Sequence, residues 1–195
     1  MIDLRRALYD KRLPKNLFKI PLDKVDTIRW VYKIAHDTAD FRHGDEIKEI
    51  QILSVTFKDG KIDKSELVAI QKAAPHPILF TAYDKWYMVI DGEPFDLSAD
   101  RQGARQLLDG NILLIERRSA KLTDLYEDLA AQFIPIDKRP SESITDTVAR
   151  YKRLQTLERE IDTMQRKVDN EKQTNKRFEY NEQLKRLRAE LEGVK

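Results

Sequence analysis

Few residues of this chain are of the types that carry out chemistry, and several of them lie in one short stretch. Two of the three histidines, His36 and His43, share a polar segment with four carboxylates, which are Asp37, Asp40, Asp45 and Glu46. Imidazole and carboxylate groups together can bind a hard cation or a transition metal. The spacing fits no standard zinc motif, so a solvated acidic loop is the favoured interpretation and no metal is expected. His76 lies between two prolines and is expected to be structural.

A second candidate is a metal-dependent nuclease site. One common nuclease core places an acidic residue before a strand that carries Glu-x-Lys, so that a metal ion and a lysine activate water. Glu46 and Lys48 have this spacing, and Asp63 or Asp91 could supply the companion carboxylate. Because 36% of the residues are charged, Glu-x-Lys also arises by chance. The nuclease is therefore an alternative hypothesis, and no catalytic residue is assigned.

Composition excludes several other classes of site. The chain has no cysteine, which excludes disulfides, thiol catalysis and Cys-ligated metal centres. Its six glycines are scattered and form no phosphate-binding loop or dinucleotide fingerprint, so no cofactor is expected. No apolar run approaches the length of a membrane span, and no signal peptide is evident. These features predict a cytoplasmic protein.

Clustered basic residues are candidates for binding nucleic acid. The net charge of +2 is too small to predict such binding, but Lys and Arg exceed Asp and Glu by four within the first twenty residues. Solvated charges on an amphipathic helix explain this arm equally well. The candidate contacts in the arm and near the C-terminus are Arg5, Arg6, Lys11, Arg12, Arg166, Lys167, Lys172, Lys176 and Arg177.

The elements that position these residues predict an α+β domain in residues 1–140, in which a small mixed sheet is covered by helices. Alternating β-branched and aromatic residues indicate four strands, namely Thr27–Ile34, Glu49–Lys58, Ile78–Tyr83 and Trp86–Ile90. Aromatic side chains on such strands can stack bases, but core positions are the favoured interpretation. The expected helices are Met1–Lys11, a helix capped by Asp63 that runs to Ala74, and one that begins at Thr123 or Asp124. The segment 93–118 is ambiguous, with a helix at Arg101–Asp109 and an apolar run at Ile112–Ile115 as its candidates.

Residues 141–195 predict a long helical tail. The stretch lacks Pro, and its first Gly is Gly193. Ser141 or Ser143 can cap the first turn. The apolar seam has the alternating three- and four-residue spacing of a coiled coil, and its members are Leu154, Leu157, Ile161, Met164 and Val168. Such a helix needs a partner, which could be its own second half, another copy or a different protein.

The seam turns polar between Asn170 and Asn181, and this polar patch has two interpretations. It is either a solvated face or the turn of a helical hairpin, which is favoured, or a network that fixes register or recognises a partner. Its candidate residues are Glu171, Lys172, Gln173, Asn175, Glu179 and Asn181.

The chain resembles a bacterial family that is catalogued as domain of unknown function 4391. The residues that carry the resemblance are Ile28, Trp30, Tyr32, Lys33, Glu49–Lys58, Pro75–Phe80, Leu125, Tyr126, Glu171–Gln173, Asn175, Glu179 and Asn181. Members of this family are typically encoded beside DNA methyltransferases and superfamily-two helicases of restriction-type defence loci. The resemblance therefore implies an accessory role in antiviral defence, and it supplies no active site.

The favoured function is that of an interaction protein which docks a DNA methyltransferase or helicase through the α+β domain, the tail or both. Self-association through the tail is a possible addition. A metal-dependent nuclease and a nucleic-acid-binding module that uses the basic arm and tail are the alternatives.

Overall fold

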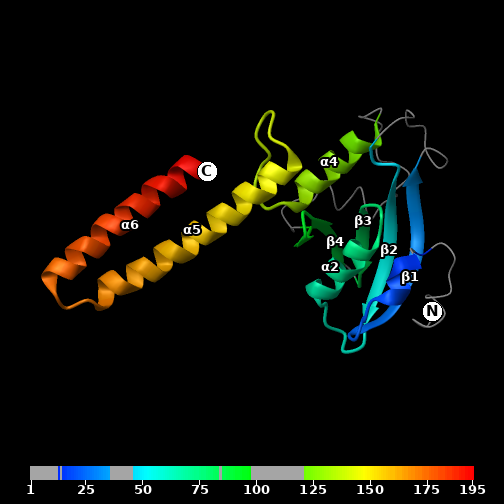
Figure 1. Cartoon of the computed structure of the whole chain (residues 1–195), viewed down its shortest axis with the longest axis horizontal. Coiled ribbons are helices and arrows are strands. Elements are labelled where there is room, and N and C mark those ends of the chain that lie inside the picture. The colour runs from blue at the N-terminus through cyan, green and yellow to red at the C-terminus, as the bar shows by residue number, and fades with distance from the viewer. Residues whose placement is uncertain (1–12, 14, 36–45, 84, 98–120) are drawn as a thin grey trace. The chain divides into compact units, whose positions relative to one another are not determined.

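The computed structural model describes residues 13, 15–35, 46–83, 85–97 and 121–195. These residues divide into two compact units, one before and one after the boundary between Pro135 and Ile136. The first unit is built on a mixed β-sheet and the second is a pair of long helices (Figure 1). This is the α+β architecture with a helical tail that the sequence predicts. The expected helices at 1–11 and 101–109 and the apolar run at 112–115 lie outside the described residues.

The sheet has five strands in the spatial order β1-β2-β3-β4-β5. Their bounds are Val25–Ala35, Glu49–Phe57, Ile78–Ala82, Lys85–Ile90 and Glu93–Asp96. β2 and β3 pair in parallel, and the other neighbours are antiparallel. The four predicted strands are confirmed. The fifth, β5, falls in the segment that the sequence left ambiguous.

Helix α2, Lys64–Ala73, connects β2 to β3. Asp63 caps it as expected, since its side chain accepts a hydrogen bond from the backbone N–H of Ser65. Leu67 and Ile70, which are three residues apart, are fully buried against the sheet. The predicted helix therefore forms the crossover between two parallel strands, which a tight turn cannot join.

The core occupies both faces of the sheet. On one face, α2 and the 3-10 helix η1, Lys15–Lys19, cover a cluster that includes Leu53, Phe80 and Tyr87. Trp30 packs partly buried against the same cluster, so Trp30 and Tyr87 take the core role rather than forming an open stacking surface. On β4, Met88 alternates with these residues and is fully buried, and helix α4, Leu122–Phe133, contacts this strand. Helix α4 begins one residue before the expected start, after Lys121, and no side chain caps it.

The second unit is an antiparallel helical hairpin. Helix α5, Ile144–Asn170, ends at a three-residue loop, and helix α6, Thr174–Val194, folds back along it (Figure 1). Of the two candidate caps, Ser143 is the one used, because its hydroxyl accepts from the N–H of Asp146. The two helices of the tail therefore pack against each other. The expected seam is buried at Leu154, Leu157 and Val168, whereas Ile161 and Met164 are only half-buried.

Candidate functional site

The candidate nuclease residues lie at opposite ends of one strand. Lys48 directly precedes β2, and Glu46 lies two residues earlier. Asp63 follows the other end of β2 and binds Lys24, which precedes the paired end of β1. A nine-residue strand spans about 27 Å, so Asp63 cannot share a metal ion with Glu46. The structure does not bring these three residues together.

Asp63 has a structural role instead. One carboxylate oxygen accepts from Lys24 Nζ at 2.6 Å, and the other accepts from the backbone N–H and the hydroxyl of Ser65. The Lys24 hydrogen bond, followed by those of Ser65, holds the pKa of Asp63 below its ordinary value. A carboxylate held this firmly in its ionised form caps a helix well and makes a poor proton acceptor.

A different polar cluster lies on the sheet where β2 begins. Glu49 and Gln51 are two residues apart on β2 and so project from the same face. Gln51 Nε2 donates to Glu49 Oε1 at 2.6 Å, and His76 Nε2 lies 3.8 Å from that same oxygen. Lys33 pairs directly with Gln51 across the antiparallel β1–β2 ladder, so it projects from that face too. We call Glu49, Gln51 and His76 the strand-edge cluster.

His76 is positioned by a side chain of α2. Gln71 donates through Nε2 to the carbonyl of His76 at 2.9 Å, and its Oε1 accepts from the N–H of Ile78 at 2.8 Å. These two bonds fix the short Pro-His-Pro connection between α2 and β3. The parallel register, in which Gln51 pairs with Ile78, then brings His76 beside Glu49. The expectation that His76 is structural accounts for its place at the strand entry but misses this contact.

A groove runs along one side of the helical hairpin and has a volume of about 590 Å³. Met164 of α5 and Leu187 of α6, both half-buried, supply its apolar side chains. The other lining residues are Thr156, Arg159, Glu160, Thr163, Lys167, Gln183, Arg186 and Glu190. Two packed helices bury only the side chains along their contact line. The groove beside that line therefore stays open, and another helix could pack into it.

Three cations and two carboxylates line the groove, an excess of one positive charge. Both of its glutamates lie near Arg153: Glu190 accepts hydrogen bonds from that guanidinium and, with Glu160, raises its pKa. Within residues 121–195, the side chains of Arg159, Lys167 and Arg186 make no hydrogen bond or ion pair. The groove therefore combines apolar side chains with unpaired positive charge.

The polar patch forms the tip of the hairpin. Glu171–Gln173 is the loop itself, where Glu171 Oε1 accepts from the N–H of Gln173 at 2.8 Å. Asn175, Glu179 and Asn181 are exposed on α6. This arrangement agrees with the turn of a helical hairpin, and buried register-fixing polar residues are not found among these positions.

Several basic candidates gather near the same tip. Arg166 pairs with Asp162 at 2.8 Å, whereas the side chains of Lys172, Lys176 and Arg177 make no hydrogen bond or ion pair within the described part of the chain. Phe178 is 67% exposed beside them. The arm candidates Arg5, Arg6, Lys11 and Arg12, and the loop residues His36 and His43, lie outside the described residues.

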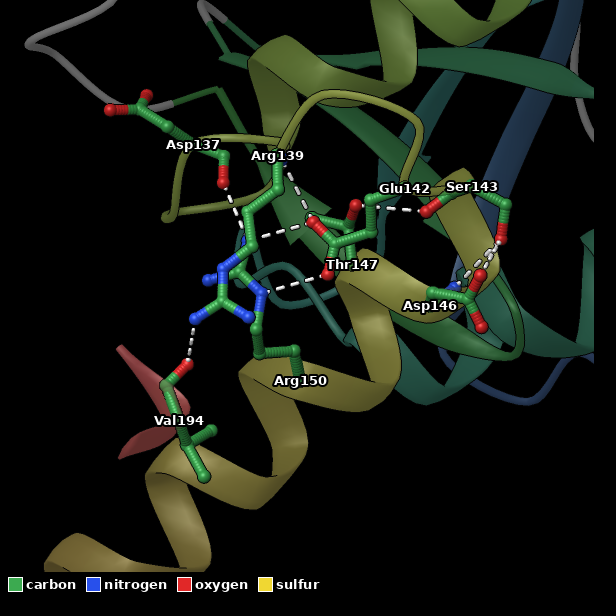
Figure 2. Close-up of polar contacts among 8 residues, drawn as sticks. All are labelled: Asp137, Arg139, Glu142, Ser143, Asp146, Thr147, Arg150 and Val194. Carbon is green, nitrogen blue, oxygen red and sulfur yellow. Dashed lines mark hydrogen bonds and ion pairs between the residues drawn. The ribbon is translucent and has the colours of Figure 1, made fainter. Parts of the chain in front are cut away.

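An ionic clasp closes the base of the hairpin (Figure 2). Arg150 donates through Nε and Nη2 to the two carboxylate oxygens of Glu142, at 2.8 and 2.9 Å, and through Nη2 to the carbonyl of Asp137 at 2.6 Å. Arg139 adds its backbone N–H to Glu142, and its guanidinium donates to the carbonyl of Val194 near the end of α6. The Arg150 hydrogen bonds are the main reason that the pKa of Glu142 falls to about 2.

Two further observations concern metal binding and membrane insertion. Among the residues that the structure describes, no group of three or more His, Asp and Glu side chains is placed to hold a metal ion. No helix in the same residues is both long enough and apolar enough to cross a membrane.

The chain matches the family described as Domain of unknown function (DUF4391) over residues 5–191. Because the match covers nearly the whole chain, the protein belongs to this family. A search of the curated proteins and a search of the solved structures each found no match.

Proposed function

We propose that this protein is a non-enzymatic accessory subunit that docks a larger DNA-modifying enzyme through its helical hairpin. The observation that carries the proposal is the open groove between α5 and α6, which offers Met164 and Leu187 beside unpaired cations. An amphipathic helix that lays its apolar face into such a groove is a common mode of recognition between proteins.

The charge of the groove narrows the chemistry of the partner. The side chains of Arg159, Lys167 and Arg186 form no ion pair with a carboxylate within residues 121–195. A partner helix with apolar residues on one stripe and Asp or Glu beside them would satisfy both features, since complementary potentials steer association and fix register. The genomic company of the family favours a DNA methyltransferase or a helicase of a restriction-type defence locus as that partner.

Co-expression with the neighbouring genes tests the proposal. We expect the protein to co-purify with one methyltransferase or helicase in a fixed ratio. Arg186→Glu should weaken the complex, because it reverses a charge at the groove. Lys185→Glu is the matched control, since it also replaces a positive charge by a negative one. Lys185 is exposed and directly precedes Arg186 on α6, but it does not line the groove. Recovery of the protein alone from every co-expression would contradict the proposal.

Nucleic-acid binding at the hairpin tip is a second candidate function. Phe178 is 67% exposed and lies next to Lys176 and Arg177, whose side chains have no partner in the described residues. An exposed ring can stack on a base while the cations contact phosphates. This candidate predicts that a single-stranded oligonucleotide binds with an affinity that falls steeply with salt and falls again in Phe178→Ala. Binding that is absent, or that does not respond to salt, would exclude it.

A further inference from the structure

A row of polar and aromatic side chains crosses the sheet from β1 to β4. Arg29 of β1 pairs with Ser54 of β2, and Ser54 pairs with Thr81 of β3. Trp86 of β4 pairs with Thr81 and ends the row. Neighbouring strands lie about 4.8 Å apart, so the row is about 14 Å long. We call Arg29, Ser54, Thr81 and Trp86 the cross-strand row.

The cross-strand row lies on the face of the sheet that α2 does not cover. Consecutive residues of a strand project from opposite faces. Ser54 follows Leu53 and Thr81 follows Phe80, and both of these apolar residues belong to the core cluster beneath α2. Arg29 is exposed, and the other members of the row are half-buried. The row is therefore accessible from solvent.

Most members of the row have unused hydrogen-bonding groups. Within the described residues, the side chains of Arg29, Ser54 and Thr81 make no hydrogen bond or ion pair. Tyr32 pairs with Ile52, two residues from Ser54 on β2, so its ring projects from the same face beside the row. The Tyr32 hydroxyl also has no hydrogen-bond partner in the described part of the chain. This face therefore presents free donors between two aromatic residues.

These groups match the two parts of a nucleotide. Guanidinium and hydroxyl groups donate to phosphate oxygens, and aromatic rings stack on bases. Arg29 carries the only charge among the row and Tyr32, so the surface favours an anionic ligand over a neutral sugar. The bases of a duplex are already paired and stacked, whereas those of an unpaired strand can be laid on an open sheet.

We propose that the cross-strand row is a binding surface for single-stranded nucleic acid. Trp86 stacks on a base at one end of the row, and Arg29 binds a phosphate at the other. The hydroxyls of Ser54 and Thr81 donate to the nucleic-acid backbone between them. Tyr32 supplies a second ring beside Arg29. The surface belongs to the first unit, so it does not depend on the hairpin, its groove or its tip.

Fluorescence anisotropy of a labelled oligothymidylate, about 12 nucleotides long, tests the surface with the full chain. Arg29→Gln should weaken binding and lower the slope of log affinity against log salt by about 0.7, the share of one phosphate contact. Lys61→Gln is the matched control, since it removes one positive charge at an exposed residue between β2 and α2 and should leave affinity and slope unchanged. Trp86→Leu should weaken binding at least about fivefold through the lost stacking, while circular dichroism shows an intact fold.

Tryptophan fluorescence gives a second measurement that needs no substitution in the row. The chain has two tryptophans, and Trp30 packs against the core cluster on the other face. In Trp30→Phe the tryptophan emission comes from Trp86 alone. Oligothymidylate should quench this emission and saturate at the same concentration as the anisotropy signal.

Three outcomes would overturn the proposal. The first is the absence of oligothymidylate binding by the folded chain. The second is binding that survives Arg29→Gln and Trp86→Leu but is lost in Phe178→Ala, which would place the nucleic acid at the hairpin tip. The third is binding by Trp30→Phe without quenching of its emission, which would show that no base stacks on the sheet.

Discussion

The clasp between Arg150 and Glu142 yields the sharpest prediction about stability. Both side chains are mostly buried, at 10% and 12% exposure, and Arg150 meets both oxygens of the carboxylate. We consider Arg150→Met, which keeps the apolar stem and removes the guanidinium. The two charge-assisted hydrogen bonds to Glu142, at about 1.5 kcal/mol each, amount to about 3 kcal/mol, the low end being chosen because both groups still reach water. The bond from Arg150 to the carbonyl of Asp137 is lost as well and adds to this figure.

The loss should depend on pH, because the clasp requires an ionised Glu142. Its pKa falls from 4.5 to about 2 in the folded chain, mainly through the Arg150 hydrogen bonds. A carboxyl group whose folded pKa is lowered contributes stability that is complete above its unfolded pKa and disappears as the pH falls toward the folded value. The difference between Arg150→Met and the unaltered protein should therefore be full at pH 7 and clearly smaller at pH 3, where the bond to the Asp137 carbonyl still contributes because it does not depend on the ionisation of Glu142.

Urea unfolding followed by circular dichroism at 222 nm measures this difference, and amide hydrogen exchange of α5 localises it to the hairpin. Arg166→Met is the matched control, since Arg166 pairs with Asp162 on the same helix but the two side chains are 74% and 60% exposed. Such a pair should contribute less than about 0.5 kcal/mol. Equal effects of the two substitutions at pH 7, or an Arg150→Met effect that is undiminished at pH 3, would refute the reasoning.

Two other predictions concern single elements. Leu157 is fully buried in the hairpin seam, so Leu157→Asp should cost several kcal/mol, whereas Ile161→Asp at a half-buried position should cost clearly less. Thermal melting compares them, and an equal loss would show that both positions are equally enclosed. Asp63→Ala removes the cap of α2 and the bond to Lys24, and we expect a loss of about 1 kcal/mol in urea unfolding. Asp59→Ala, in the turn that follows β2, serves as its control, and an effect as large as that of Asp63→Ala would argue against the cap.

Local signals explain why most elements could be predicted. Asp63 precedes an amphipathic run and caps α2, and the alternation of apolar residues identifies the strands of the sheet. β5 could not be predicted with the same signals, because it is four residues long and contains Pro94. Proline is tolerated in a sheet only where its missing N–H is not needed, and β5 lies at one edge of the five described strands, where that condition can hold.

The hairpin shows where a periodic pattern stops being informative. The seam predicted a partner for α5 but not its identity, because the break between the helices contains neither Pro nor Gly. The loop is instead held by local hydrogen bonds, in which Glu171 N–H donates to the carbonyl of Lys167 and the Glu171 carboxylate accepts from Gln173. Hydrogen bonds of this kind are only slightly more favourable than those of a continuous helix. Composition alone therefore does not decide between one straight helix and a helical hairpin.

The strand-edge cluster could not be predicted from the sequence, since Glu49 and His76 are far apart in the chain. They meet because β2 and β3 pair in parallel through α2, and because Gln71 fixes the connection that carries His76. Glu46 and Lys48, which carry the Glu-x-Lys spacing, lie just before the start of β2, whereas their proposed companion Asp63 lies beyond its other end. Residue types alone did not select Glu49 or Gln51 as site residues, and the strand register is what groups them with His76.

Site-specific crosslinking from the groove tests the central claim most directly. A photo-reactive amino acid at Thr163, which is exposed and lines the groove, should crosslink to the co-expressed partner. The same amino acid at Glu158, which is exposed on α5 but does not line the groove, is the control and should give little product. A docking groove predicts a strong product from Thr163 alone. Equal products from both positions, or a product from Glu158 only, would contradict it.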